Sequence, residues 1–73
     1  MSTPKQADPK RCDDFLRALT AGLPHGYALT AAGLKWRDFS LELARSADMT
    51  LRYARAVVAQ RAAIRRRQRA ARK

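Results

Sequence analysis

The chain has 73 residues, of which 47% are hydrophobic and 30% are charged, and its formal net charge is +10. One small domain of this length buries only about 60% of its unfolded surface. We therefore expect a thin core that is completed by a partner or by self-association, as a dimer or a higher oligomer. The single cysteine excludes an intramolecular disulfide. The sequence has neither a signal peptide nor an apolar run of the ~18–20 residues that cross a membrane, which predicts a cytoplasmic protein without membrane contact.

The positive charge is concentrated near the C-terminus. Residues 1–50 hold seven Lys or Arg and six Asp or Glu, whereas residues 51–73 hold nine Lys or Arg and no acidic residue. A block this basic is typical of a segment that binds a polyanion, and we expect nucleic acid, with an acidic protein or an acidic membrane surface as alternatives. A solvated tail that only aids solubility is the alternative without a binding function.

The N-terminal part of the chain predicts a flexible arm followed by one amphipathic helix. Residues 1–8 are polar and form the arm. Asp8 can cap the helix, and Pro9 suits its first position, where a missing N–H costs nothing. Gly22 and Pro24 are predicted to end the helix. Its apolar face is formed at helical spacing by Cys12, Phe15, Leu16, Leu19 and Leu23.

Two short helices are predicted next, on either side of a glycine. Tyr27 to Ala32 form about one and a half turns, which Gly33 stops. Lys35 to Ala44 form the following helix. The apolar residues on one face of that helix are Trp36, Phe39 and Leu43.

A long helix is predicted after a break at residues 46–48, where either Ser46 or Asp48 can act as the cap. No Gly or Pro interrupts the sequence from Met49 to about Arg67. One stripe of this helix is formed by Met49, Tyr53, Ala56, Val57, Gln60 and Ile64. A second apolar strip, formed by Leu51, Ala54 and Val58, is predicted to contact a protein partner outside the domain.

These elements predict an all-α fold of three to four helices, with a central helix-turn-helix and a long basic C-terminal helix. The predicted organisation is a flexible arm over residues 1–8, a helical domain over residues 9–64, and an arginine-rich tail over residues 65–73 that continues the last helix. No alternation typical of a β-strand is present.

The stretch LTAAGLKWRDFSLELAR, residues 29–45, has the pattern of a DNA-reading helix-turn-helix. Gly33 can adopt the left-handed conformation that the turn needs, and Phe39 can anchor the second helix in the core. Trp36 is open to two interpretations, because its spacing to Phe39 favours a core residue and its place after the turn favours a DNA contact. A plain helical bundle is the alternative for the whole stretch. The predicted base contacts are Lys35, Trp36, Arg37 and Ser40.

Residues 13–62 resemble the helix-turn-helix regions of phage terminase small subunits and related small phage DNA-binding regulators. The resemblance rests on the helix DDFLRAL, the small-residue helix ending AAGL, the basic helix after it and the long Ala- and Arg-rich helix. It implies specific DNA binding at packaging or regulatory sites, usually as an oligomer, in the host cytoplasm if the protein is phage-encoded. The matching positions are Lys35, Trp36, Arg37 and Ser40 in the contact region, residues 46–48 in the break, and Tyr53 as the aromatic residue.

Two positions depart from the pattern of that family. Leu29 stands where an alanine is usual, four residues before the glycine, and Glu42 stands where the second helix usually has an apolar anchor. Together with Asp38, Glu42 places two carboxylates on a helix that would approach phosphates. A carboxylate can accept a hydrogen bond from the cytosine amino group, so the acidic residues weaken general electrostatic docking without excluding DNA.

The basic residues predict contacts with the phosphate backbone, which give affinity but do not read sequence. An arginine-rich helix of this kind can also bind RNA, and a small phage-encoded inhibitor or adaptor that binds protein is a further alternative. The predicted phosphate contacts are Arg45, Arg52, Arg55, Arg61, Arg65, Arg66, Arg67, Arg69, Arg72 and Lys73.

No catalytic or metal-binding pattern is present. His25 and Cys12 stand alone, whereas a zinc site needs three or four ligands. Ser40 and Thr30 have no His or Asp nearby in sequence that would activate them. We therefore expect a protein that is not an enzyme and that uses no cofactor and no metal.

Overall fold

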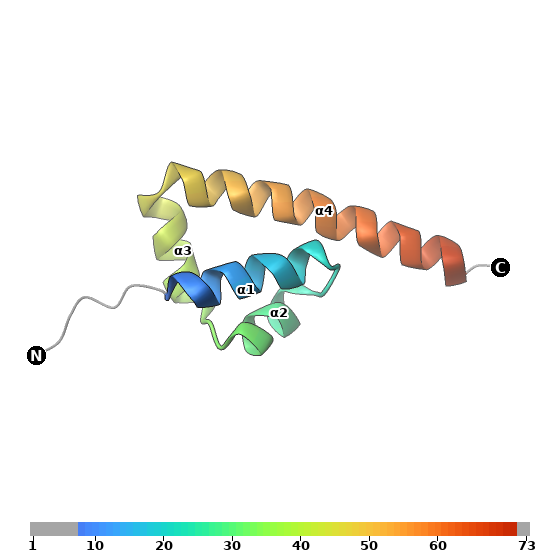
Figure 1. Ribbon diagram of the computed structural model, residues 1–73, viewed down its shortest axis with the longest axis horizontal. Helices are drawn as coiled ribbons and strands as arrows, with labels where there is room; N and C mark the ends of the chain where they lie inside the picture. Colours follow the sequence, from blue (N-terminus) through green and yellow to red (C-terminus); the bar gives the residue numbers. More distant parts are fainter. Residues whose placement is uncertain (1–7, 72–73) are drawn as a thin grey trace, which may run out of the picture.

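The computed structural model describes residues 8–71, and all secondary-structure elements in that range are helices, which confirms the predicted all-α fold (Figure 1). Residues 1–7 of the predicted arm, and Arg72 and Lys73 of the predicted tail, lie outside the described residues. The helices are α1 (Pro9–Thr20), α2 (His25–Ala32), α3 (Trp36–Arg45) and α4 (Ala47–Ala71).

The helix boundaries differ from the predicted ones at two connections. Helix α2 begins at His25, two residues before the predicted start at Tyr27, and Pro24 is its extended N-cap. The predicted three-residue break before α4 is a single residue, Ser46, whose hydroxyl oxygen accepts a hydrogen bond from the N–H of Met49 at 3.1 Å. Ser46 is therefore the side-chain cap of the two candidates, and Asp48 lies in the first turn of α4, where the helix dipole favours its charge.

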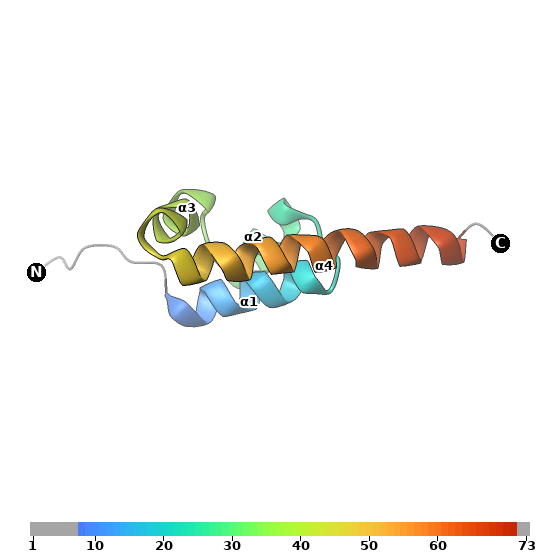
Figure 2. The same ribbon diagram turned by 90° about the horizontal axis from the view of Figure 1, so that it is seen from above.

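Helix α4 is the longest of the four helices in the described range. Its N-terminal half packs on α1 and α3, and α1 also packs on α2. Figure 1 shows α1 and α3 both beneath α4, Figure 2 shows them diverging to different sides of it when seen from above, and in both views the last turns of α4 extend past the other helices. The helix continues through the predicted tail as far as Ala71.

Helices α1 and α2 end with the same glycine-based motif. Gly22 (φ 97°) and Gly33 (φ 67°) have the left-handed backbone that glycine adopts without strain. In each case the residue after the glycine donates its N–H to a carbonyl five residues back: Leu23 to Ala18 at 3.1 Å, and Leu34 to Leu29 at 2.9 Å. This is the Schellman arrangement, which satisfies carbonyls at a helix end and turns the chain sharply.

An arginine from a distant part of the chain binds a carbonyl at each of these two ends. The guanidinium of Arg11 in α1 donates to the Gly33 carbonyl at 3.0 Å, and that of Arg67 in α4 donates to the Ala21 carbonyl at 2.7 Å. A cation at a helix C-terminus also interacts favourably with the helix dipole. These two arginines therefore tie the ends of α2 and α1 to other helices.

Aromatic rings from all four helices meet in the core. Phe15 of α1 and Phe39 of α3 are completely buried, with ring centroids 4.7 Å apart in an edge-to-face arrangement. Tyr53 of α4 lies 5.4 Å from the Phe39 ring and 5.9 Å from the ring of His25 in α2. Such edge-to-face pairs add to the stabilisation from burying apolar surface. We call these rings, together with that of Trp36, the aromatic cluster.

A buried glutamine connects α4 to the segment between α1 and α2. The side-chain amide of Gln60, only 7% exposed, donates to the Leu23 carbonyl at 2.7 Å and lies 3.4 Å from Nδ1 of His25. The other ring nitrogen of His25 lies 2.9 Å from the Tyr53 hydroxyl. Because the amide donates to Nδ1, this network assigns the imidazole proton to Nε2, which then donates to Tyr53. Gln60, predicted as part of one stripe of the helix, is thus buried with its amide nitrogen paired.

Replacing Gly22 with alanine will destabilise the fold. An alanine would have to adopt a left-handed backbone, and its Cβ would lie 2.9 Å from the Cβ of Ala63 and closer still to the Arg67 guanidinium. We expect the free energy of unfolding in urea to fall by about 2–4 kcal/mol. Gly26→Ala is the matched control, because Gly26 lies inside α2 with no atom near the added Cβ. The control should gain about 0.5–1 kcal/mol, and equal losses in both variants would contradict the assigned role of Gly22.

Candidate nucleic-acid interface

The unit formed by α2, Gly33 and α3 presents one side to the core and the other to solvent. Ala28 and Phe39 are completely buried, and Leu34, just after the turn, is 7% exposed. Gly33 (φ 67°, ψ 33°) reverses the chain between the two helices within three residues. The predicted anchor Phe39 is therefore buried and Gly33 has the left-handed backbone expected at the turn, but α2 packs mainly on α1 and α3 mainly on α4, with few direct contacts between α2 and α3.

Lys35 and Arg37 are both exposed at the N-terminal end of α3. Lys35 is the N-cap residue, and its side chain forms no capping hydrogen bond. Within residues 8–71, neither side chain takes part in an ion pair or an intramolecular hydrogen bond. Both cations therefore remain available to an external anion or base edge.

Trp36 belongs to the aromatic cluster and is also accessible. Its ring centroid lies 5.8 Å from that of Phe39 and 6.0 Å from that of Tyr53, yet the residue is 44% exposed. The two interpretations of this residue are thus compatible. One part of the indole packs on the cluster, and the remainder contributes to the surface beside Lys35 and Arg37.

The Ser40 hydroxyl is turned back onto its own helix. It donates to the Arg37 carbonyl at 2.9 Å, and the residue is only partly exposed. This local bond occupies the hydroxyl proton, so Ser40 offers an external group only its lone pairs.

Leu41, with 48% of its surface exposed, was not among the predicted contacts. It lies four residues after Arg37 and four before Arg45, on the same solvent-facing side of α3. The helical period that predicted the buried face also defines this outer face, so the signal was present in the sequence. Leu41 is thus an exposed apolar side chain next to Arg37 on the outer face of α3.

The two departures from the family pattern have local explanations. Leu29 is partly buried against the core, so α2 has room for a larger side chain than alanine at this position. Glu42 is 20% exposed and lies 4.0 Å from the Arg45 guanidinium, while the neighbouring Leu43 packs against the core in the place of an apolar anchor. The charge of Glu42 is therefore directed partly at Arg45 of the same helix.

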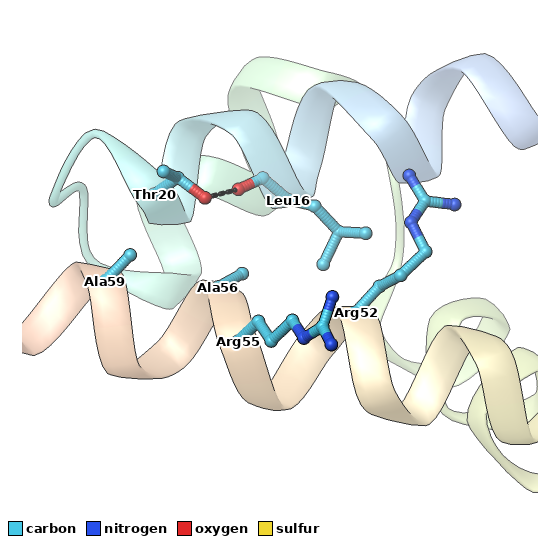
Figure 3. Close-up of a pocket in the computed structure, with 6 residues that line it drawn as sticks. All are labelled: Leu16, Thr20, Arg52, Arg55, Ala56 and Ala59. Carbon is cyan, nitrogen blue, oxygen red and sulfur yellow. Dashed lines mark hydrogen bonds between the residues drawn. The ribbon is translucent and has the colours of Figure 1, made fainter.

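The predicted phosphate contacts of α4 fall into two groups. Arg52 donates to the Asp13 carboxylate at 2.5 Å, which raises the pKa of Arg52, and Arg67 binds the Ala21 carbonyl. These two guanidiniums are engaged within the fold. Figure 3 shows Arg52 beside Arg55 at a pocket between α1 and α4. The α4 arginines that are exposed without an intramolecular bond, within the described range, are Arg55, Arg61, Arg65, Arg66 and Arg69.

The basic end of α4 lies far from the entry of α3. Tyr53 packs beside Trp36, whereas Arg65 is twelve residues further along α4. At about 1.5 Å per residue, the two regions are roughly 18 Å apart along the helix axis. The structure therefore has two separate basic surfaces, one at α3 and one on the C-terminal part of α4 (residues 61–71), which we call the C-terminal arm.

Cys12 and the carboxylates do not form a reactive cluster. Burial raises the pKa of the Cys12 thiol, and the nearby charges of Glu42 and Asp13 raise it further. Among residues 8–71, no three His, Cys, Asp or Glu side chains come together as a metal site would require. No helix in this range combines the length and apolar character needed to cross a membrane.

Comparison with protein-family models, with curated proteins and with solved structures finds no match to this chain.

Removing the Arg67 side chain will weaken the attachment of the C-terminal arm to α1. In Arg67→Ala the Ala21 carbonyl loses its charged donor, and we expect the free energy of unfolding to fall by about 0.5–1.5 kcal/mol. Arg66→Ala is the matched control, because Arg66 is exposed one position away and forms no such bond. Urea denaturation measures both variants. A loss of the same size in Arg66→Ala would show that helix composition, and not the cap, sets the effect.

Proposed function

We propose that the protein is a small double-stranded-DNA-binding protein that reads base edges with the N-terminal part of α3. The observation that carries the proposal is the one-sided α2–Gly33–α3 unit: Phe39 is completely buried on one side, while Lys35 and Arg37 are exposed on the other. An exposed arginine early in such a helix suits the paired acceptors of guanine in the major groove. Trp36, Ser40 and Leu41 complete the proposed reading surface.

The C-terminal arm supports the same proposal through its charge. In this part of α4, Arg61, Arg65, Arg66 and Arg69 are exposed, and residues 51–73 contain no acidic residue that would neutralise them. Contacts with phosphates release counterions, so affinity through the arm should fall steeply with salt and should depend little on sequence.

The resemblance to phage proteins narrows the proposal to a DNA-packaging recognition subunit or a compact transcriptional regulator. Both roles need specific DNA binding, and they differ in the partner proteins. The proposal includes action in the cytoplasm, of the host if the protein is phage-encoded, and binding without catalysis.

The proposal is tested by separating sequence reading from phosphate binding. A preferred site is first selected from a random duplex pool, and affinity for that site and for random duplex is then titrated at several salt concentrations. The reading variant Lys35→Ala/Arg37→Ala should lose about tenfold or more in affinity for the selected site and much less for random duplex. The arm variant Arg65→Gln/Arg66→Gln/Arg69→Gln retains the Arg67 cap. In this variant the slope of log affinity against log salt concentration should be less steep by about 2–3, both for the selected site and for random duplex.

Two results would contradict the assignment of α3 as the reading helix. One is an equal loss for both DNAs in the reading variant, which would mean that Lys35 and Arg37 contact only phosphates. The other is hairpin RNA displacing the protein from its selected duplex at lower concentration than duplex DNA does, which would favour the RNA-binding alternative.

The exposed strip on the outer side of α4 supports self-association as a second part of the proposal. Leu51 is 52% exposed and Val58 is 68% exposed, and Ala54 lies exposed between them. Exposed apolar side chains on one helix face are typical of helix–helix contacts between subunits.

Charge substitutions in this strip should shift the protein towards the monomer. In sedimentation experiments at micromolar concentration, we expect Leu51→Glu/Val58→Glu to be monomeric under conditions where the unmodified chain is a dimer or a higher oligomer. Leu41→Glu is the matched control, because it alters a leucine of similar exposure on α3. If the unmodified chain is itself monomeric, the proposed self-association through this strip is wrong.

A further inference from the structure

A groove between α1 and α4 has the chemistry of a binding site that the DNA-binding proposal does not use. It is a shallow groove, open to solvent, with a volume of about 410 Å³, and it is lined by Leu16, Thr20, Arg52, Arg55, Ala56 and Ala59 (Figure 3). Leu16 and Ala56 are 6% and 5% exposed, so they form the bottom of the groove, where the two helices touch. In Figure 3 the Arg52 side chain extends from α4 towards α1, whereas the Arg55 side chain lies along α4.

The polar groups of the groove are engaged to different degrees. Arg52 is held by Asp13 of α1 at 2.5 Å, and the Thr20 hydroxyl donates to the Leu16 carbonyl at 2.9 Å. The Arg55 guanidinium has neither an ion pair nor an intramolecular hydrogen bond in the part of the chain that the structure describes. The groove therefore offers an apolar floor, one uncommitted cation and the lone pairs of a hydroxyl.

We propose that this groove binds an acidic amphipathic helix of a partner protein, with an apolar side chain on the floor and a carboxylate on Arg55. A carboxylate is the natural partner of a guanidinium, and an apolar side chain covers the small alanine surface that a phosphate would leave bare. Partner helices of this kind place apolar and acidic residues three or four positions apart, which matches the spacing of Arg55 and Ala59 in α4.

Other segments of this protein fit the groove less well. Residues 1–7 contain no acidic residue, so the N-terminal segment supplies no carboxylate for Arg55. A second copy has only six acidic residues against sixteen Lys or Arg, so it brings few carboxylates to the groove, and the proposed self-association uses the separate strip of Leu51, Ala54 and Val58. Charge complementarity therefore favours an acidic partner of different sequence.

The position of the groove permits binding at the same time as DNA. The lining residues come from α1 and α4 alone, and in the view of Figure 2 the α1 and α3 ribbons lie on different sides of the α4 ribbon. A partner in the groove leaves Lys35 and Arg37 free. The inference does not depend on the DNA-binding proposal, because it rests on α1 and α4 alone.

The probe is a designed peptide helix with leucines on one face and glutamates beside them, and the control probe is a scrambled peptide of the same composition. Titration of the full chain, followed by amide NMR shifts, should perturb Thr20, Ala56 and Ala59 with the first peptide and not with the second. Arg55→Glu should weaken binding about fivefold, whereas Arg61→Glu, the same charge change on another side of α4, should weaken it by less than about twofold. Ala59→Leu fills the groove and should also weaken binding, with Ala31→Leu in α2 as its control.

Each other outcome would overturn the proposal. Shifts confined to residues 61–71, or equal losses in Arg55→Glu and Arg61→Glu, would mean that the peptide binds the basic surface without using the groove. Absence of binding at millimolar peptide would remove the site. If random duplex DNA perturbs Thr20 and Ala59, and Arg55→Glu weakens DNA binding more than Arg61→Glu does, the groove is a phosphate site. That last result would leave the proposed reading role of α3 standing.

Discussion

The contact between Phe15 and Phe39 is the constraint on which the arrangement of the helices depends. Both rings are completely buried, and their centroids are 4.7 Å apart. Tyr53, His25 and Trp36 pack around them, so one cluster joins α1, α2, α3 and α4. A chain of this size has few other large side chains to bury, and its stability must come from a small number of such contacts. The orientation of α3 is therefore set by Phe39, with Trp36 and Leu43 packed beside it.

Hydrogen bonds between helices add to the packing of the aromatic cluster. Gln60 satisfies the Leu23 carbonyl inside the fold, and Arg11 and Arg67 bind carbonyls at the ends of α2 and α1. Each contact joins helices that the aromatic rings have already brought close. A thin core thus gains rigidity from hydrogen bonds at the helix ends, where unpaired carbonyls would otherwise need water. The same device has a cost for binding, because a guanidinium held by a carbonyl is not free for a phosphate.

The sequence predicted the helices because their signals are local. Asp8, Pro9, Gly22 and Gly33 mark helix ends, and the apolar spacing identified Phe15 and Phe39 as core residues. It could not predict the bonds of Arg11 and Arg67, which join residues 22 and 46 positions apart in sequence and exist only once the helices are packed. For the candidate site, exposure of Lys35 and Arg37 followed from the helical period. The inward turn of the Ser40 hydroxyl and the shared role of Trp36 depend on packing and on local competition for hydrogen bonds.

The bond between Arg67 and Ala21 fixes the position of the C-terminal part of α4 relative to α1, and it fixes the rotation of α4 about its own axis. Tyr53 holds one point of α4 at the aromatic cluster, and Arg67 holds another point at the end of α1. The exposed arginines beyond Gln60 are thus held at set angles around the helix and at a set displacement from α3. Inserting one residue between Gln60 and Arg67 would rotate the C-terminal end of α4 by about 100° about the helix axis and move it by about 1.5 Å along that axis. The number of residues in α4 therefore sets the distance between the basic surface at α3 and the C-terminal arm.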